Sequence, residues 1–258
     1  MQEFIIYKNS KIAYSDVGKG SAIVLLHGFL ENSTMWNDIV EKLKKSNRII
    51  CIDLLGHGNS ECIGYVHSME DMADAVKAVL KELKIRRSIF IGHSMGGYVS
   101  LAFAEKYLEC VKGLCLLNST SQADSEERKE LRLKACKLAQ TNYINLVKMS
   151  IANLFVEETR KQFSLEIEQI KQEAIKTPVQ GYIAATKGMC LRKNKENVLQ
   201  QINKRLIING KKDSVIDIKS ITNEAENTNT PIEFLSNGHM SYIENREEVI
   251  KMLKIFVK

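Results

Sequence analysis

No apolar run in the 258-residue chain approaches the roughly 20 residues that a membrane-spanning helix requires. The first sixteen residues, MQEFIIYKNSKIAYSD, have neither the basic start nor the long apolar segment of a signal peptide. Six cysteines are present without a CxxC pair, which predicts free, mostly buried thiols in a reducing compartment. We therefore expect a cytoplasmic protein with no membrane association.

Basic tracts with interleaved aromatic residues, which are typical of nucleic-acid-binding proteins, are also missing. The net charge is +6, but Lys and Arg occur singly or in pairs. The sequence has no metal-ligand spacing and no glycine-rich phosphate loop. We expect no nucleic-acid partner, no metal and no other cofactor; the oligomeric state is left open.

The first part of the chain alternates strand and helix patterns. A hairpin is expected near the start, with its turn at Asn9-Ser10. Unbroken apolar runs, typical of strands buried on both faces, alternate with segments that have a helical apolar stripe. This alternation predicts a mostly parallel sheet covered by helices on both faces. The strands are expected at 22–27, 48–53, 88–93 and 111–118, and the helices at 35–45, 68–83 and 95–108.

The pattern changes after residue 119. Four segments between 120 and 200 read as helices, one of them EETRKQFSLEIEQIKQEAI, and none reads as a strand. Strands return at 205–210 and 232–235, and a helix over 245–257 closes the chain. We therefore expect one α/β core made of residues 1–119 and 201–258, interrupted by a helical cap over 120–200.

The stretch IFIGHSMGGYVS, residues 89–100, places a serine where a strand is expected to become a helix. Ser94 has Gly92 and Gly96 two positions to either side. The turn is sharp, and side chains at those two positions would collide. The pattern is the G-x-S-x-G nucleophile elbow, which exposes a hydroxyl at a helix N-terminus. It predicts that Ser94 is a catalytic nucleophile.

A serine nucleophile needs a base, and the expected chain order is serine, acid, histidine. His239 is the only histidine after Ser94. The acid is expected in the loop after the strand at 205–210, which favours Asp213. Its rival Asp217 is placed to cap the following helix, and Asn118 after the strand at 111–118 cannot hold a charge.

Two backbone N–H groups are expected to form an oxyanion hole. One belongs to Met95, directly after the predicted nucleophile, and the other to Phe29 in the loop after the strand at 22–27. Gly28 permits that turn. We interpret His27 and His57 as structural residues, and His67 and His93 receive no role.

Five motifs together resemble the α/β-hydrolase superfamily, in its lidded group of small esterases and enol-lactonases. The resemblance covers essentially the whole chain. It implies a Ser94–Asp213–His239 triad, an oxyanion hole at Phe29 and Met95, and a cap near 120–200. The motifs are HGF (27–29), DLLGHGNS (53–60), GHSMGG (92–97), GKKD (210–213) and GHMSYIEN (238–245).

The chain departs from the family pattern at two positions. Leu55 stands where proline is common in the loop at 53–60, which should matter little. Leu30 stands near a point where proline is associated with the peracid-forming members, which disfavours perhydrolase activity.

The expected reaction is hydrolysis of a small-molecule carboxylic ester with a small or medium acyl chain. The alternatives are a lyase, a C–C hydrolase or a carrier-protein-ester hydrolase on the same scaffold, or a ligand-binding member without activity. An acyl-carrier protein is the less favoured partner, although residues 120–200 hold 14 Lys or Arg against 10 Asp or Glu. The pocket is predicted to be lined by Phe29, Ile151, Leu154, Phe155 and Tyr182.

Overall fold

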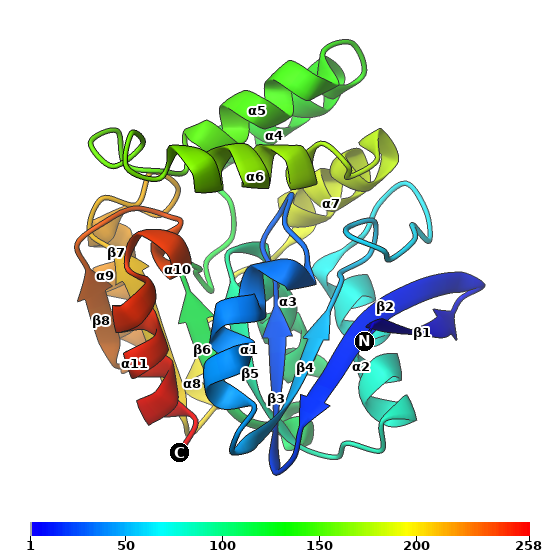
Figure 1. The fold of residues 1–258 in the computed structure, drawn as a ribbon, viewed down its shortest axis with the longest axis vertical. Helices are drawn as coiled ribbons and strands as arrows, with labels where there is room; N and C mark the ends of the chain where they lie inside the picture. Colours follow the sequence, from blue (N-terminus) through cyan, green and yellow to red (C-terminus); the bar gives the residue numbers. More distant parts are fainter. Residues whose placement is uncertain (1) are drawn as a thin grey trace.

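The computed structural model describes residues 2–258 and contains an eight-stranded sheet (Figure 1). The strand order is β1-β2-β4-β3-β5-β6-β7-β8. The first two strands form a hairpin, β2 pairs antiparallel with β4, and all later neighbours are parallel. The strands are β1 (Gln2–Tyr7), β2 (Ser10–Gly18), β3 (Ser21–Leu26), β4 (Asn47–Ile52), β5 (Ser88–His93), β6 (Val111–Leu117), β7 (Arg205–Gly210) and β8 (Ile232–Leu235).

The hairpin turn lies at Lys8 and Asn9, one residue earlier than expected. Both residues have positive φ, 48° and 63°. A two-residue turn of type I′ requires positive φ at both central positions, and its twist matches that of the strands. Tyr7 therefore pairs directly with Ser10.

The two faces of the parallel sheet have separate hydrophobic cores, because successive residues of a strand point in opposite directions. In β3, Val24 and Leu26 belong to one core, whereas Ile23 and Leu25 belong to the other. Helices cover both faces, as the sequence predicts (Figure 1). The first core is covered by α2 (Met69–Glu82), α3 (Met95–Lys106), α8 (Glu196–Gln200) and α9 (Ile218–Thr228), and the second by α1 (Asn37–Leu43) and α11 (Arg246–Phe256).

Four helices between β6 and β7 form a layer over the carboxyl ends of the parallel strands (Figure 1). We call them the helical layer: α4 (Glu126–Ala139), α5 (Tyr143–Ala152), α6 (Ser164–Ala174) and α7 (Val179–Leu191). Within it, α4 packs against α5 and α7, and α5 packs against α6.

The segment before α6 is not helical, in contrast to the expectation for EETRKQFSLEIEQIKQEAI. Residues 157–163 form turns, and the helix begins only at Ser164. Glu244, from a distant part of the chain, accepts hydrogen bonds from the Val156 N–H at 3.2 Å and the Thr159 hydroxyl at 2.5 Å. This long-range carboxylate holds the turn conformation, which local periodicity could not indicate.

Parallel pairing brings the loops after five strands to one edge of the sheet, under the helical layer. The carboxyl ends of parallel strands are the usual place for ligand sites in α/β sheets. The residues in these loops are Gly28 and Phe29 after β3, Ser94 after β5, Asn118 after β6, Asp213 after β7 and His239 after β8.

The central strand β5 should contribute strongly to stability. Phe90 is fully buried, and its ring centroid lies 4.5 Å from that of Phe103 in α3. We expect Phe90→Ala to lower the free energy of unfolding by about 3–5 kcal/mol, because it leaves a cavity in the core. Urea unfolding measures this loss. Phe4→Ala is the control. Because Phe4 is 50% exposed, this substitution should lower the free energy of unfolding by much less than Phe90→Ala. Equal losses for both variants would contradict the assigned packing.

Candidate active site

Ser94 lies between the last residue of β5 and the first residue of α3, with a strained backbone. Its φ and ψ are 48° and −116°, a conformation that costs a non-glycine residue on the order of 1–3 kcal/mol. The Ser94 N–H donates to the Leu117 carbonyl at 3.0 Å, and the Ser119 hydroxyl donates to the Ser94 carbonyl at 2.7 Å. These two bonds to the neighbouring strand and its loop hold the turn in place.

The glycines on either side of Ser94 are required by close backbone contacts. A Cβ atom on Gly96 would lie 2.1 Å from the Leu26 carbonyl oxygen, and one on Gly92 would lie 2.4 Å from the Gly96 carbonyl carbon. Any side chain at either position would therefore displace α3 from the sheet. The lack of room for side chains at these positions agrees with the prediction, although the atoms in the way belong to the backbone and not to other side chains.

Ser94, His239 and Asp213 form a continuous hydrogen-bonded chain. Ser94 Oγ lies 2.9 Å from His239 Nε2, and His239 Nδ1 lies 2.9 Å from both carboxylate oxygens of Asp213. A carboxylate can only accept, so Nδ1 carries the proton and Nε2 is free to accept from the serine hydroxyl. The side chains of His239 and Asp213 are buried. The structure thus brings together the three residues predicted from the sequence.

Asp213 is held as a carboxylate by several donors. Its Oδ1 accepts from the N–H groups of Val215 and Ile216 at 2.8 and 3.0 Å, and its Oδ2 accepts from the Asn118 amide at 2.9 Å. Burial by itself would raise the pKa of Asp213, but His239 and these donors outweigh it and lower the pKa. Asp213 therefore stays ionised at neutral pH.

The two other residues considered for the acid position have different roles. Asp217 caps α9, as predicted, by accepting from the Ser220 N–H at 2.9 Å. Asn118 is a hydrogen-bond donor to the acid, and it also donates to the Gly238 carbonyl at 3.1 Å beside His239. From the sequence, Asn118 could only be excluded as the acid, because its contact with Asp213, 95 positions away, depends on the fold.

The predicted oxyanion-hole residues flank Ser94. Met95 is the first residue of α3, so its N–H has no partner within the helix. Phe29 follows Gly28 in the loop after β3. Neither N–H donates to an acceptor among residues 2–258. Both groups are thus free to bind an oxygen that carries developing negative charge.

A second buried network, which the sequence argument missed, links two of these loops. Glu31 Oε2 accepts from the Gly28 N–H at 2.7 Å and lies 2.8 Å from His93 Nδ1. Glu31 Oε1 accepts from the Tyr242 hydroxyl at 3.0 Å, and His93 Nε2 lies 3.1 Å from the His239 carbonyl oxygen. The Phe29 loop and the His239 loop are therefore tied to the same buried pair.

The hydrogen bonds of His93 define its charge. Both of its ring nitrogens face acceptors, a carboxylate and a carbonyl, so both must carry protons. Burial by itself lowers the pKa of His93, but Glu31 outweighs it and raises the pKa. Burial would likewise raise the pKa of Glu31, but the charge of His93 lowers it. The two residues form a buried ion pair. The signal in the sequence is the carboxylate of Glu31, two residues after Phe29 in the loop that follows a buried strand.

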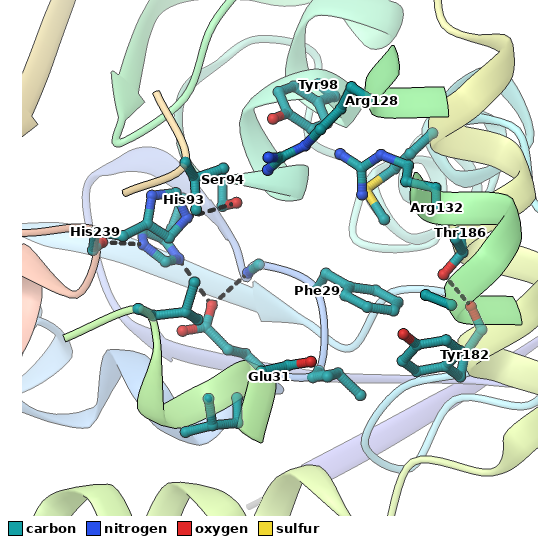
Figure 2. Close-up of a pocket in the computed structure, with 18 of the residues that line it drawn as sticks. Phe29, Glu31, His93, Ser94, Tyr98, Arg128, Arg132, Tyr182, Thr186 and His239 are labelled. Carbon is teal, nitrogen blue, oxygen red and sulfur yellow. Dashed lines mark hydrogen bonds and ion pairs between the residues drawn. The ribbon is translucent and has the colours of Figure 1, made fainter. Parts of the chain in front are cut away.

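A cavity of about 290 Å³ lies between Ser94 and the helical layer. Four of the predicted pocket residues line it: Phe29, Ile151, Leu154 and Tyr182. Phe155 does not, so that prediction is wrong. Its side chain, 2% exposed, packs into the second hydrophobic core instead. Figure 2 shows Phe29 and Tyr182 on one side of the cavity and two arginines, Arg128 and Arg132, extending into it from α4.

Metal-ligand geometry is not found in the part of the chain that the structure describes: no group of three or more His, Cys, Asp or Glu residues converges. Likewise, among residues 2–258, no helix is both long and apolar enough to cross a bilayer.

The family model of the alpha/beta hydrolase fold matches residues 21–246. The chain belongs to this family. The predicted resemblance and the predicted fold are both confirmed.

Two known hydrolases resemble this chain over nearly its whole length. A thermophilic esterase from Thermogutta terrifontis has a TM-score of 0.88 and 30% identity, covering 96% of this chain and 95% of that one. A 3-oxoadipate enol-lactonase from Acinetobacter baylyi is 25% identical and covers 92% and 88% of the two chains. A Mycobacterium tuberculosis protein of uncharacterised function is 37% identical over 107 residues. That match covers 42% of this chain and only 31% of the mycobacterial protein.

Two further histidines of the hydrolase support the loops. His27 Nδ1 lies 2.7 Å from the Gly28 carbonyl, and its Nε2 accepts from the Leu54 N–H at 2.9 Å. Burial lowers the pKa of His57 to about 3, so its ring is neutral. Its Nδ1 lies 3.1 Å from the Leu55 carbonyl oxygen. The contacts of His27 and His57 agree with the structural roles inferred from the sequence.

The charge of His93 predicts a pH dependence of stability. Its pKa is raised in the folded state, so the stabilisation is fully present below the unfolded pKa of about 6.5 and is lost as pH rises through the folded pKa. We expect His93→Gln to cost about 3–5 kcal/mol of unfolding free energy at pH 6, because it leaves Glu31 buried and unpaired. This difference from wild type should shrink as the pH rises toward 9.

Urea unfolding at several pH values measures this difference. His67→Gln is the matched control. Burial lowers the pKa of His67, so its proton is lost in both states above pH 7 and its difference from wild type should stay constant there. A His93→Gln difference that is equally constant from pH 6 to 9 would mean that His93 is neutral.

Proposed function

We propose that this hydrolase cleaves a carboxylic ester of small or medium acyl chain through an acyl-enzyme on Ser94. One observation carries the proposal: the hydrogen-bonded chain from Ser94 Oγ through His239 to Asp213 lies at a cavity large enough for a small molecule. The similarity to an esterase and to an enol-lactonase supports the same reaction class, since both kinds of enzyme cleave an ester bond.

In the proposed mechanism, Ser94 Oγ attacks the ester carbonyl carbon while His239 Nε2 accepts the hydroxyl proton. The carbonyl oxygen becomes an oxyanion that accepts hydrogen bonds from the N–H groups of Phe29 and Met95. The C–O bond to the alcohol then breaks, and His239 returns the proton to the leaving oxygen. Water attacks the acyl-enzyme by the same route and releases the acid.

Asp213 acts through His239. Its two oxygens face Nδ1, which fixes the tautomer with the free lone pair toward Ser94 and stabilises the imidazolium that forms in each step. The ion pair of Glu31 and His93 holds the Phe29 loop and the His239 loop at a fixed separation. We assign Glu31 and His93 as positioning residues.

We further propose that residues 120–200 act as a cap that shapes the substrate site. Helices α4, α5 and α7 supply Arg128, Ile151 and Tyr182 to the cavity wall opposite Ser94. Excluding water there strengthens the electrostatic contacts in the site. The volume of about 290 Å³ lies just below the roughly 300–1,000 Å³ range of ligand pockets, which favours short acyl chains.

Hydrolysis of p-nitrophenyl esters from acetate to decanoate tests the proposal. We expect wild type to prefer chains up to about six carbons and Ser94→Ala to lose on the order of 10³-fold or more in kcat. Ser150→Ala is the matched control. Ser150 also lines the cavity, but its hydroxyl donates to the Leu146 carbonyl at 2.8 Å, so its loss should leave kcat nearly unchanged.

Two results would overturn the proposal. One is a folded wild-type protein that hydrolyses none of the esters. The other is ester hydrolysis that Ser94→Ala retains, which would assign the reaction to another group.

A further inference from the structure

One face of α4 forms part of the cavity wall. The residues that it contributes are spaced by three, one and three positions, as expected for a single face of a helix. They are Arg128, Leu131, Arg132 and Ala135. Figure 2 shows the two arginine side chains extending from α4 into the space that Ser94, Phe29 and Tyr182 also line. Two guanidinium groups thus share a small cavity with the predicted nucleophile.

The positive charge on this wall exceeds the negative charge that faces it. Asp124, the carboxylate that pairs with Arg132, does not itself line the cavity and is shared with a second arginine. Arg132 Nε lies 2.7 Å from Oδ2 of Asp124, and Arg192 Nη1 lies 2.7 Å from its Oδ1. The two Nη groups of Arg132 have no acceptor among the described residues.

Arg128 has no acidic partner in residues 2–258, although its side chain is partly buried. Glu31 is the only carboxylate among the described residues that line the cavity, and it is already neutralised by His93. A guanidinium that loses part of its hydration without a counter-charge is costly, and a bound anion would remove that cost. Arginine is also the side chain best suited to bind a carboxylate, through two parallel hydrogen bonds.

We infer that Arg128 and Arg132 form an anion subsite, and that the physiological substrate is an ester bearing a carboxylate remote from the scissile bond. The inference rests on the proposed ester hydrolysis and adds its substrate class. The small cavity limits the substrate to a short chain, such as a half-ester of a dicarboxylic acid or an acylated hydroxy acid. The carboxylate is bound by Arg128 and the free Nη groups of Arg132.

Two pairs of esters, each differing by one group, test the subsite. Monomethyl adipate and methyl hexanoate differ only in a terminal carboxylate or methyl on the acyl side. 6-Acetoxyhexanoate and hexyl acetate differ in the same way on the alcohol side. We expect wild type to favour the charged member of at least one pair by tenfold or more in kcat/KM. The pair that responds identifies which side of the ester faces α4.

Arg128→Gln should lower kcat/KM for the preferred charged ester by about 10- to 100-fold, the usual effect of removing a hydrogen bond to a charged group. The matched neutral ester should change by less than about twofold. Arg128→Lys keeps the charge without the planar fork, so an intermediate loss is expected. Lys134→Gln, an exposed cation outside the cavity on the same helix, is the control and should have no selective effect.

The subsite would be overturned if wild type showed no preference in kcat/KM for the charged member of either pair. It would also be overturned if Arg128→Gln lowered kcat/KM equally for both members of a pair. If wild type still cleaves the neutral esters and Ser94→Ala does not, the proposed ester hydrolysis stands and only the subsite fails. If wild type cleaves no ester, the proposed function fails, and binding decides the subsite. Calorimetry with Ser94→Ala should then show tighter binding of monomethyl adipate than of methyl hexanoate, and Ser94→Ala/Arg128→Gln should abolish the difference.

Discussion

The backbone of Ser94 adopts a strained conformation with positive φ, and the rest of the site depends on that turn. It lifts the hydroxyl above the end of β5 and leaves the Met95 N–H free at the start of α3. The strain, on the order of 1–3 kcal/mol, is sustained because α3 packs so closely on the sheet that neither Gly92 nor Gly96 has room for a Cβ atom. The fully buried strand β5 and the buried first ten residues of α3 fix the geometry that the short loop alone could not hold.

The loops around Ser94 are positioned by buried polar contacts. Glu31 and His93 connect the Phe29 loop to the His239 loop, and Asn118 connects Asp213 to the backbone beside His239. Removing one partner of the Glu31–His93 ion pair lowers the free energy of unfolding by more than the intact pair contributes to it, since the other charge is left buried and unpaired. The site is therefore held in one arrangement by contacts that must all form together.

The sequence was informative where local patterns determine structure. Alternating buried strands and helices predicted the sheet, and chain order with strand ends predicted that Asp213 and His239 would reach Ser94. It was uninformative where contacts join distant residues. Glu31 and His93 are 62 positions apart, and Glu244 shapes the turns before α6. Phe155 was misplaced because α5 ends at Ala152, beyond which helical periodicity no longer predicts which way a side chain points.

Covalent labelling with an alkyl fluorophosphonate tests most directly whether Ser94 is an activated nucleophile. The reagent phosphonylates a serine whose hydroxyl is deprotonated by a neighbouring base, with loss of fluoride. Intact-mass analysis and peptide mapping should find one adduct per chain, on the peptide containing Ser94, and much slower labelling in Asp213→Asn. An unlabelled folded protein, or an adduct on any other residue, would contradict the account.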